Sequence, residues 1–223
     1  MTDGEPFFRV EWVVENLDEI GVRIGEHVYL TVLAVVIGLA VSFALALLIQ
    51  RRPRLYGPVV GVTGTLYAIP SLAFFALLIP FTGTGVVTAL LALVSYTLLI
   101  LVRNITEALN GVPPDAVEAA TGMGYSRGQR LWRVELPLAL PVIVAGIRIA
   151  TVTTIGLVTV TALIGQGGLG YLIVNLGINR GSSPFGPTAT YTGVVLAVGL
   201  AVIADLALLA VQRALTPWAR RRG

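Results

Sequence analysis

Long apolar runs alternate with short polar stretches along most of this chain. Five runs approach the ~20 residues that a helix needs to cross a membrane, at about 28–49, 58–80, 86–102, 138–163 and 191–211. The third run is short and can be extended back to Thr84. A further apolar patch within 165–179 is too short to span, which predicts an interfacial or re-entrant helix. The pattern predicts an all-α, polytopic membrane protein with about five transmembrane helices.

The first 26 residues have a different character. They carry a high density of acidic side chains among apolar ones, which predicts an amphipathic helix in the membrane interface, with Trp12 at headgroup depth. No basic start followed by an apolar core precedes residue 27, so no secretory signal is expected. We therefore divide the chain into an acidic extracytoplasmic segment (1–26), a membrane domain (27–213) and a basic cytoplasmic tail (214–223).

Composition narrows the possible chemistry. The chain is 56% hydrophobic and only 12% charged, whereas soluble domains average about 25% charged residues. It has no cysteine and one histidine, His27, so no metal site is expected, and His27 is interpreted as the outer boundary of the first helix. All 15 basic residues are arginine. A phosphate-binding Walker A loop needs lysine, so this chain is not expected to bind or hydrolyse ATP in that way. No nucleic-acid binding is expected.

The arginines also predict the orientation in the membrane. If the chain crosses five times, three arginines fall on one side, and eleven fall in the first loop, around residues 103–133 and at the end of the chain. Cytoplasmic loops collect arginine. We therefore expect the N-terminus outside and the C-terminus in the cytoplasm. The eleven are Arg51, Arg52, Arg54, Arg103, Arg127, Arg130, Arg133, Arg213, Arg220, Arg221 and Arg222.

The polar segment 107–137 predicts two short helices with a break. Pro113 and Pro114 can begin the first helix, because proline in the first turn sacrifices no intrahelical hydrogen bond. Gly122 and Gly124 can end it, because glycine adopts the left-handed conformation cheaply. Neither helix is long enough to span a membrane.

The second short helix is predicted to start at Ser126, which has capping-box spacing to Gln129, and to run to about Leu136 before Pro137. Apolar side chains stand beside this capping box, including Met123 and Trp132. A docking surface explains that pattern better than a solvated loop without a partner, which rarely exposes so much apolar surface.

These residues carry a family resemblance. Glu118-Ala119-Ala120, then Gly124, then Val-Glu-Leu-Pro ending at Pro137 resembles the cytoplasmic EAA loop of permease subunits of binding-protein-dependent (type I) ABC importers. The continuations ALPVIVAGIRIATVTTIG and ALIGQGGLG most resemble the osmoprotectant branch, which imports glycine betaine, carnitine or choline. The resemblance extends over about 26–213 and is most specific over 67–170.

The resemblance implies a fold, partners and site residues. The loop would insert into a groove on a separate ATPase subunit, which holds ATP and Mg, while this chain binds no cofactor. It also implies a second permease subunit, identical or related, a separate extracytoplasmic binding protein, and the plasma (inner) membrane of a prokaryote. Glu118 would be the polar contact to the ATPase and Gly124 the turn. The implied coupling residues are Glu118, Ala119, Ala120, Gly124, Trp132, Leu136 and Pro137.

Polar residues inside the predicted crossings form two stripes. They predict a translocation pathway between two subunits, although threonines that bond their own helix and tie helices together would give the same pattern. Pro70 is expected to kink the second crossing. The stripes consist of Thr63, Tyr67 and Ser71 in the second crossing and Thr151, Thr154 and Thr161 in the fourth.

Arg148 and Asp205 are the only charges well inside the predicted crossings. Counting ~1.5 Å per residue from Pro137 and Arg213 places both roughly 12–17 Å from the inner boundary. An unpaired charge at that depth is costly. We therefore expect the two to pair, within one subunit or between two, as a structural tie rather than a substrate contact.

The stretch from Gly165 to Gly170 matches the G-x-G-x-x-G pattern of dinucleotide sites. That fingerprint requires a preceding strand and an acidic residue about 20 positions later. Here a membrane helix precedes it, and no acidic residue lies between Glu135 and Asp205. We instead expect a sharp turn at the outer gate, made by Gly165, Gly167, Gly168 and Gly170.

The resulting hypothesis is a non-catalytic permease subunit that works by alternating access. ATP-driven closure of the ATPase would push on the 107–137 segment and rock two permease subunits. Two alternatives stay open. The chain could serve an amino-acid or methionine ABC importer, whose EAA loops are similar, or it could be an ion-coupled secondary transporter, which predicts inverted repeats and midplane charges.

Overall fold

The computed structural model describes residues 7–180 and 183–216, and in these ranges it contains helices and no strand. Several short 3₁₀ and π-helical turns connect the α-helices. The α-helices are α1 (Val10–Glu15), α2 (Leu17–Arg51), α3 (Tyr56–Ala68), α4 (Ser71–Thr82), α5 (Val86–Asn110), α6 (Pro114–Gly122), α7 (Arg127–Arg130), α8 (Leu136–Val160), α9 (Leu169–Tyr171) and α10 (Gly186–Leu215).

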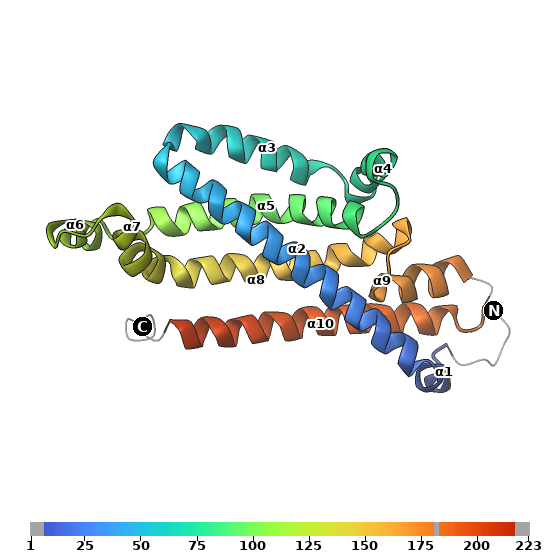
Figure 1. Ribbon diagram of the computed structural model, residues 1–223. Coiled ribbons are helices and arrows are strands. Elements are labelled where there is room, and N and C mark those ends of the chain that lie inside the picture. Colours follow the sequence, from blue (N-terminus) through green and yellow to red (C-terminus); the bar gives the residue numbers. More distant parts are fainter. Residues whose placement is uncertain (1–6, 181–182, 217–223) are drawn as a thin grey trace.

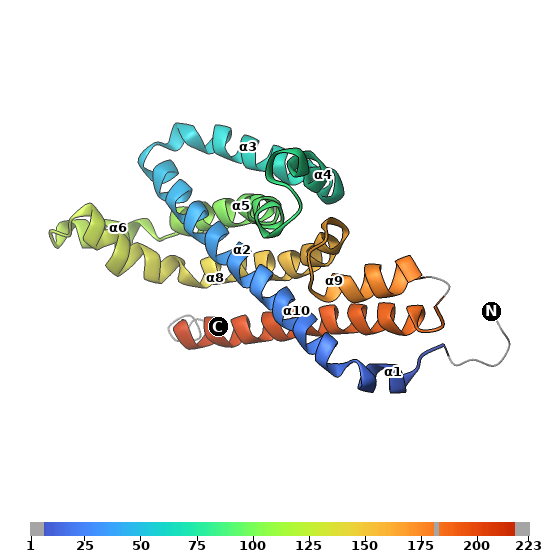
Figure 2. The ribbon, with the colours of Figure 1, turned by 45° about the vertical axis from the view of Figure 1, so that its right-hand side comes forward.

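Four helical stretches are long and apolar enough to cross a membrane. They are α2, α5, the continuous stretch Arg127–Ile164 that contains α8, and α10. Figure 1 shows α5, α8 and α10 side by side, with α2 crossing them at an incline, and Figure 2 shows the same arrangement. Figure 1 shows α2 ending and α5 beginning at opposite ends of the bundle, so the bent pair α3–α4 between them is a candidate fifth passage. The fold is therefore all-α, as the hydrophobic pattern predicts.

The second crossing is not the single kinked helix predicted for 58–80. α3 and α4 form a broken pair with an angle of 98° between them. The backbone at Ile69 and Pro70 is extended, with ψ values of 126° and 133°. The residue before a proline is disfavoured in the helical region, so the helix stops at Ala68 rather than bending.

The first membrane helix begins earlier than predicted. α2 starts at Leu17 and continues for 35 residues, about 50 Å at ~1.5 Å per residue, which exceeds the ~30 Å hydrocarbon layer. The prediction of a separate interfacial helix up to residue 26 was therefore wrong beyond Asn16: only α1 stands apart from α2. The acidic positions Asp3 and Glu5 lie outside the described residues. His27 lies ten residues inside α2, not at its boundary.

Small residues determine how closely the long helices pack. A side chain at Gly38 of α2 would overlap Thr97 of α5, and one at Gly146 of α8 would overlap Asn104 of α5. Such close approaches are the usual basis of helix association in membranes, where apolar side chains find lipid as favourable as protein. Around these contacts a core cluster gathers Leu101, Ile105 and Ile143 among others, all buried. α5 is thereby held centrally between α2 and α8.

The stretch predicted as interfacial or re-entrant is helical. It consists of α9, a π-helical turn at Leu172–Gly177 and a 3₁₀ turn at Ile178–Arg180. Figures 1 and 2 show it beside the first half of α10. Leu169 and Leu172 are fully buried against Ile20 and Ala197. This packing within the bundle favours the re-entrant alternative over a helix lying on the surface.

Candidate functional site

The 107–137 segment projects from one end of the bundle. Figures 1 and 2 show α6 and α7 beyond the ends of α5 and α8, at the same end as the last turns of α10 and opposite to α1. α6 begins at Pro114 with Pro113 at its N-cap, as predicted. Gly124 has φ +83°, the left-handed conformation that turns the chain between α6 and α7. The predicted break between two short helices is present.

The capping box at the second helix is confirmed. The backbone N–H of Gln129 donates to the Ser126 hydroxyl at 3.3 Å, and the backbone N–H of Ser126 donates to the Gln129 side chain at 2.9 Å. These bonds satisfy two N–H groups that the helix itself leaves unpaired. They fix the orientation in which α7 leaves the turn.

The predicted end of this helix before Pro137 was wrong. A π-helical turn over Leu131–Glu135 joins α7 to α8, and the N–H of Leu136 donates to the carbonyl oxygen of Leu131. Pro137 lies in the first turn of α8, where its missing N–H is tolerated. Leu136 and Pro137 therefore belong to the membrane helix. α7 and α8 thus form one continuous helical stretch, Arg127–Ile164.

The 107–137 segment exposes apolar side chains. Met123 and Trp132 are 67% and 65% exposed, and Glu118 and Ala119 are also exposed. Ala120 of α6, predicted as a contact residue, is instead buried, with 1% exposure. The exposed set forms a surface suited to a protein partner.

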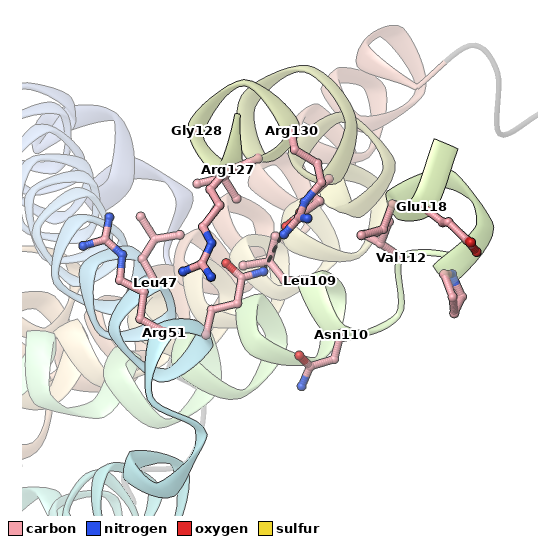
Figure 3. Close-up of a pocket in the computed structure, with 14 residues that line it drawn as sticks. Leu47, Arg51, Leu109, Asn110, Val112, Glu118, Arg127, Gly128 and Arg130 are labelled. Atoms are coloured by element: carbon pink, nitrogen blue, oxygen red, sulfur yellow. Dashed lines mark hydrogen bonds and ion pairs between the residues drawn. The ribbon is translucent and has the colours of Figure 1, made fainter. Parts of the chain in front are cut away.

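A cavity of about 1020 Å³ lies between this segment and the ends of α2 and α5. Figure 3 shows Arg51 of α2 and Arg127 and Arg130 of α7 on one side of it, whereas Glu118 points away from them. Its lining also includes Glu135, a carboxylate that the sequence reasoning left without a role. The sequence did offer a signal for a role of Glu135, because it lies directly before the apolar run of α8 and five residues after Arg130.

The predicted stripe in the second crossing is not continuous. Ser71 lies in α4, across the 98° break from Thr63 and Tyr67 in α3. Tyr67 is partly exposed and meets the buried Tyr96 of α5 edge to face, with ring centroids 5.9 Å apart. The Tyr96 hydroxyl donates to the carbonyl oxygen of Ile69 at 2.5 Å, which supplies the break with a hydrogen bond that the interrupted helix no longer provides.

Several of the stripe threonines bond within their own helices. The hydroxyls of Thr63, Thr151, Thr154 and Thr161 donate to carbonyl oxygens of the preceding turn. Thr63, Thr154 and Thr161 are also buried within this one chain. A pathway between two subunits needs side chains at the surface of each, and Thr151, Tyr67 and Ser71 are at least partly exposed.

Arg148 and Asp205 come together as predicted. The guanidinium of Arg148 in α8 donates through Nε to Oδ1 of Asp205 at 2.9 Å and through Nη2 to Oδ2 at 2.8 Å. Arg148 also donates to Gln212, which in turn donates to the carbonyl oxygen of Pro141. The contacts join α8 to α10 within one subunit. The prediction of a pair is confirmed, whereas its role stays a prediction.

The glycine turn rests on α2. Gly165 and Gly168 have positive φ values, consistent with the predicted sharp turn. The backbone N–H of Gly168 donates to Glu26 at 2.8 Å, and that of Leu169 donates to Nδ1 of His27 at 3.2 Å. The fully buried His27 places its Nε2 3.0 Å from the carbonyl oxygen of Ile155 in α8. Its imidazole thus bridges α8 and the turn, a role that the sequence did not indicate.

These features define the membrane subunit of a transporter, with a broken crossing, a glycine turn held against α2 and a projecting helical segment. Residues 28–220 match the family described as binding-protein-dependent transport system inner membrane component. The chain belongs to this family. It is therefore a non-catalytic, multi-pass inner-membrane permease without a cofactor of its own, and it works with an ATPase and a binding protein. Family membership removes the ion-coupled secondary transporter from consideration.

Relatives of this chain are permeases. It is 36% identical over 91% of both chains to the glycine betaine/carnitine/choline transport system permease protein OpuCB of Bacillus subtilis (strain 168). It is 34% identical over 96% of both chains to the choline transport system permease protein OpuBB of the same organism. It is 38% identical to the osmoprotectant import permease protein OsmW of Salmonella typhimurium, over 93% of this chain and 97% of the relative.

The fold also resembles solved structures. Inward-facing forms of the MetNI methionine ABC transporter superpose with TM-scores of 0.74 and 0.77, at 26% and 25% identity. These matches cover 86% and 88% of this chain and 93% and 96% of the solved chains. The arrangement of helices is therefore that of a type I ABC importer permease.

Proposed function

We propose that this chain is the permease subunit of an ATP-driven importer for osmoprotectants such as glycine betaine, carnitine or choline. The observation that carries the substrate class is the similarity, at 34–38% identity over nearly the whole chain, to permeases of osmoprotectant systems. The similarity to the methionine transporter is lower, at 25–26%.

The 107–137 segment is the proposed docking site for the ATPase. Its exposed residues Glu118, Ala119 and Met123 belong to α6 and the turn that follows it, where a groove on another protein has access to them. Trp132 is also exposed but lies nearer to the membrane helices, with its ring 6.2 Å from that of Phe43 in α2. Gly124 provides the turn, and Leu136 and Pro137 start the membrane helix that receives the movement. Closure of the ATPase would push this segment, and the continuous α7–α8 connection would tilt α8.

Two permease subunits are proposed for the complete transporter, either two copies of this chain or one copy with a related subunit. One chain supplies five passages, too few to enclose a pathway for a small solute. We propose that Tyr67, Ser71 and Thr151 line the pathway, since their side chains are at least partly exposed on the isolated chain. The glycine turn at 165–170 would form part of the gate at the opposite end from α6.

The proposed orientation places α6, α7 and the end of α10 in the cytoplasm and α1 outside. The support is the positive-inside rule: Arg51, Arg103 and Arg127 all lie toward the α6 end, as does Arg213. Arg220, Arg221 and Arg222 lie outside the described residues.

Uptake by the reconstituted transporter tests the function. The permease is purified with its cognate ATPase, placed in proteoliposomes, and supplied with the binding protein and radiolabelled glycine betaine, carnitine or choline. We expect uptake that requires ATP and is inhibited by an excess of another osmoprotectant but not by methionine. Inhibition by methionine alone would instead assign the chain to the methionine class.

A further inference from the structure

A buried carboxylate lies where the projecting segment joins the membrane helices. The side chain of Glu135 is 7% exposed and belongs to the π-helical turn between α7 and α8. Glutamate is almost never buried without a partner, because removing its charge from water is costly. π-Helical turns of this kind occur frequently at functional sites.

Each oxygen of Glu135 is held by a different element. Oε1 accepts a hydrogen bond from Nε of Arg130 in α7 at 2.6 Å. Oε2 accepts one from Nε2 of Gln50 at 3.0 Å, and Gln50 lies 85 residues away at the end of α2. Glu135 thus connects the projecting segment to the first membrane helix.

The same arginine continues the connection to α6. Nη1 of Arg130 donates to the hydroxyl of Thr121 at 3.3 Å, and that hydroxyl donates to the carbonyl oxygen of Val117 one turn earlier. Thr121 directly follows the Glu118-Ala119-Ala120 motif. An unbroken line of side-chain hydrogen bonds therefore runs from α6 through Arg130 and Glu135 to α2. We name it the Thr121–Gln50 chain.

The surroundings of the Thr121–Gln50 chain indicate that these hydrogen bonds fix the position of the docking segment relative to α2. Val117 and Leu131 also pack against the core cluster, but apolar contacts are non-directional and allow sliding. Gln50, Arg130 and Glu135 line the cavity of about 1020 Å³, so the segment is not closely packed against α2 on that side. Directional, charge-assisted hydrogen bonds hold the geometry across this gap.

We propose that Glu135 is a positioning residue, and that the Thr121–Gln50 chain transmits movement of the docking segment to α2 while the continuous α7–α8 connection moves α8. This proposal rests on the proposed coupling function. It adds a second route, so that one push on α6 moves two membrane helices together.

The test uses the complete transporter in proteoliposomes and measures uptake per ATP hydrolysed. Glu135→Gln removes the charge that holds Arg130, Gln50→Leu removes the link to α2, and Thr121→Val removes the link to α6. We expect each to retain the bound ATPase and its basal hydrolysis while uptake per ATP falls about fivefold or more, the lower range of allosteric coupling. Arg54→Gln, at an exposed position in the loop after α2 and outside the docking segment, serves as the control and should leave the uptake per ATP hydrolysed unchanged.

Exchange of the charges provides a rescue. Arg130→Glu and Glu135→Arg alone each place like charges together, whereas the double variant restores an opposite pair and should recover part of the coupling. If Glu135→Gln fails to fold, Gln50→Leu and Thr121→Val decide the matter, because neither leaves a buried charge without its arginine. Normal coupling in both of these variants would overturn the proposal.

A second measurement separates this proposal from the function on which it depends. The chain has no cysteine, so spin labels at Ala119→Cys and Arg52→Cys report the distance between α6 and the end of α2. We expect a narrow distribution in the parent and a broader one with Gln50→Leu. An unchanged distribution contradicts the transmission route. A parent transporter without ATP-driven uptake contradicts the proposed function instead.

Discussion

Arg148 of α8 and Asp205 of α10 form a two-pronged ion pair, although 57 residues separate them in the chain. Their side chains are 23% and 35% exposed on the isolated subunit. Arg148 lies near the middle of α8 and Asp205 ten residues before the end of α10, and a charge within a membrane helix is costly unless it is paired. Gln212 and the carbonyl oxygen of Pro141 extend the contact along both helices.

We predict that Arg148→Ala lowers the yield of folded protein to less than about half, because it leaves Asp205 charged and unpaired within the membrane. The measurement is size-exclusion chromatography of the detergent-extracted protein. Arg54→Ala, at an exposed position in the first loop, is the control and should behave like the parent. If Arg148→Ala leaves both folding and transport intact, the pair is not a structural tie.

Gly124 is predicted to be essential to coupling through its backbone alone. Its φ is +83° and a side chain there would meet open space, so the cost of substitution is conformational strain of ~1–2 kcal/mol. Gly124→Val should uncouple ATP hydrolysis from transport while leaving the protein in the membrane. Gly124→Asn should be milder, because asparagine tolerates this conformation. The measurement is uptake per ATP hydrolysed in proteoliposomes. An equal value in the parent and in Gly124→Val would contradict the prediction.

Gly170 should be intolerant of a side chain for a different reason. A Cβ there would overlap the backbone carbonyl of Thr159, which cannot move aside as a flexible side chain can. We expect Gly170→Ala to destabilise the protein by about 1–3 kcal/mol, the usual cost of overpacking, seen as a lower midpoint of thermal unfolding. Gly156→Ala, where nothing lies within 4 Å, is the matched control and should be neutral or stabilising.

The orientation can be tested directly at the projecting tip. Because the chain has no cysteine, Met123→Cys introduces one thiol at a position whose native side chain is 67% exposed. We expect a membrane-impermeant maleimide to leave it unlabelled in intact cells and to label it in inside-out vesicles. Labelling in intact cells would place the docking segment outside and exclude an intracellular ATPase as its partner.

Local sequence determined most elements of this protein, but not the break between α3 and α4 or the continuity of α7 with α8. Apolar runs specified the membrane passages, and Ser126 with Gln129 specified the start of α7, since capping depends only on neighbouring residues. Gly124 likewise marked the turn between α6 and α7, since its left-handed backbone is also a local property. The pairing of Arg148 with Asp205 was also predictable, because the membrane core offers a charge few other partners.

Tertiary structure decided the rest. Which carboxylate, histidine or glycine faces another helix depends on helix rotation and on contacts between residues far apart in sequence, which no local pattern encodes. His27 was therefore placed at a boundary although it bridges α8 and the glycine turn. Glu135 was left without a role although it joins Arg130 to Gln50. Only packing three helices together brings these groups within hydrogen-bonding distance and thereby determines what each residue does.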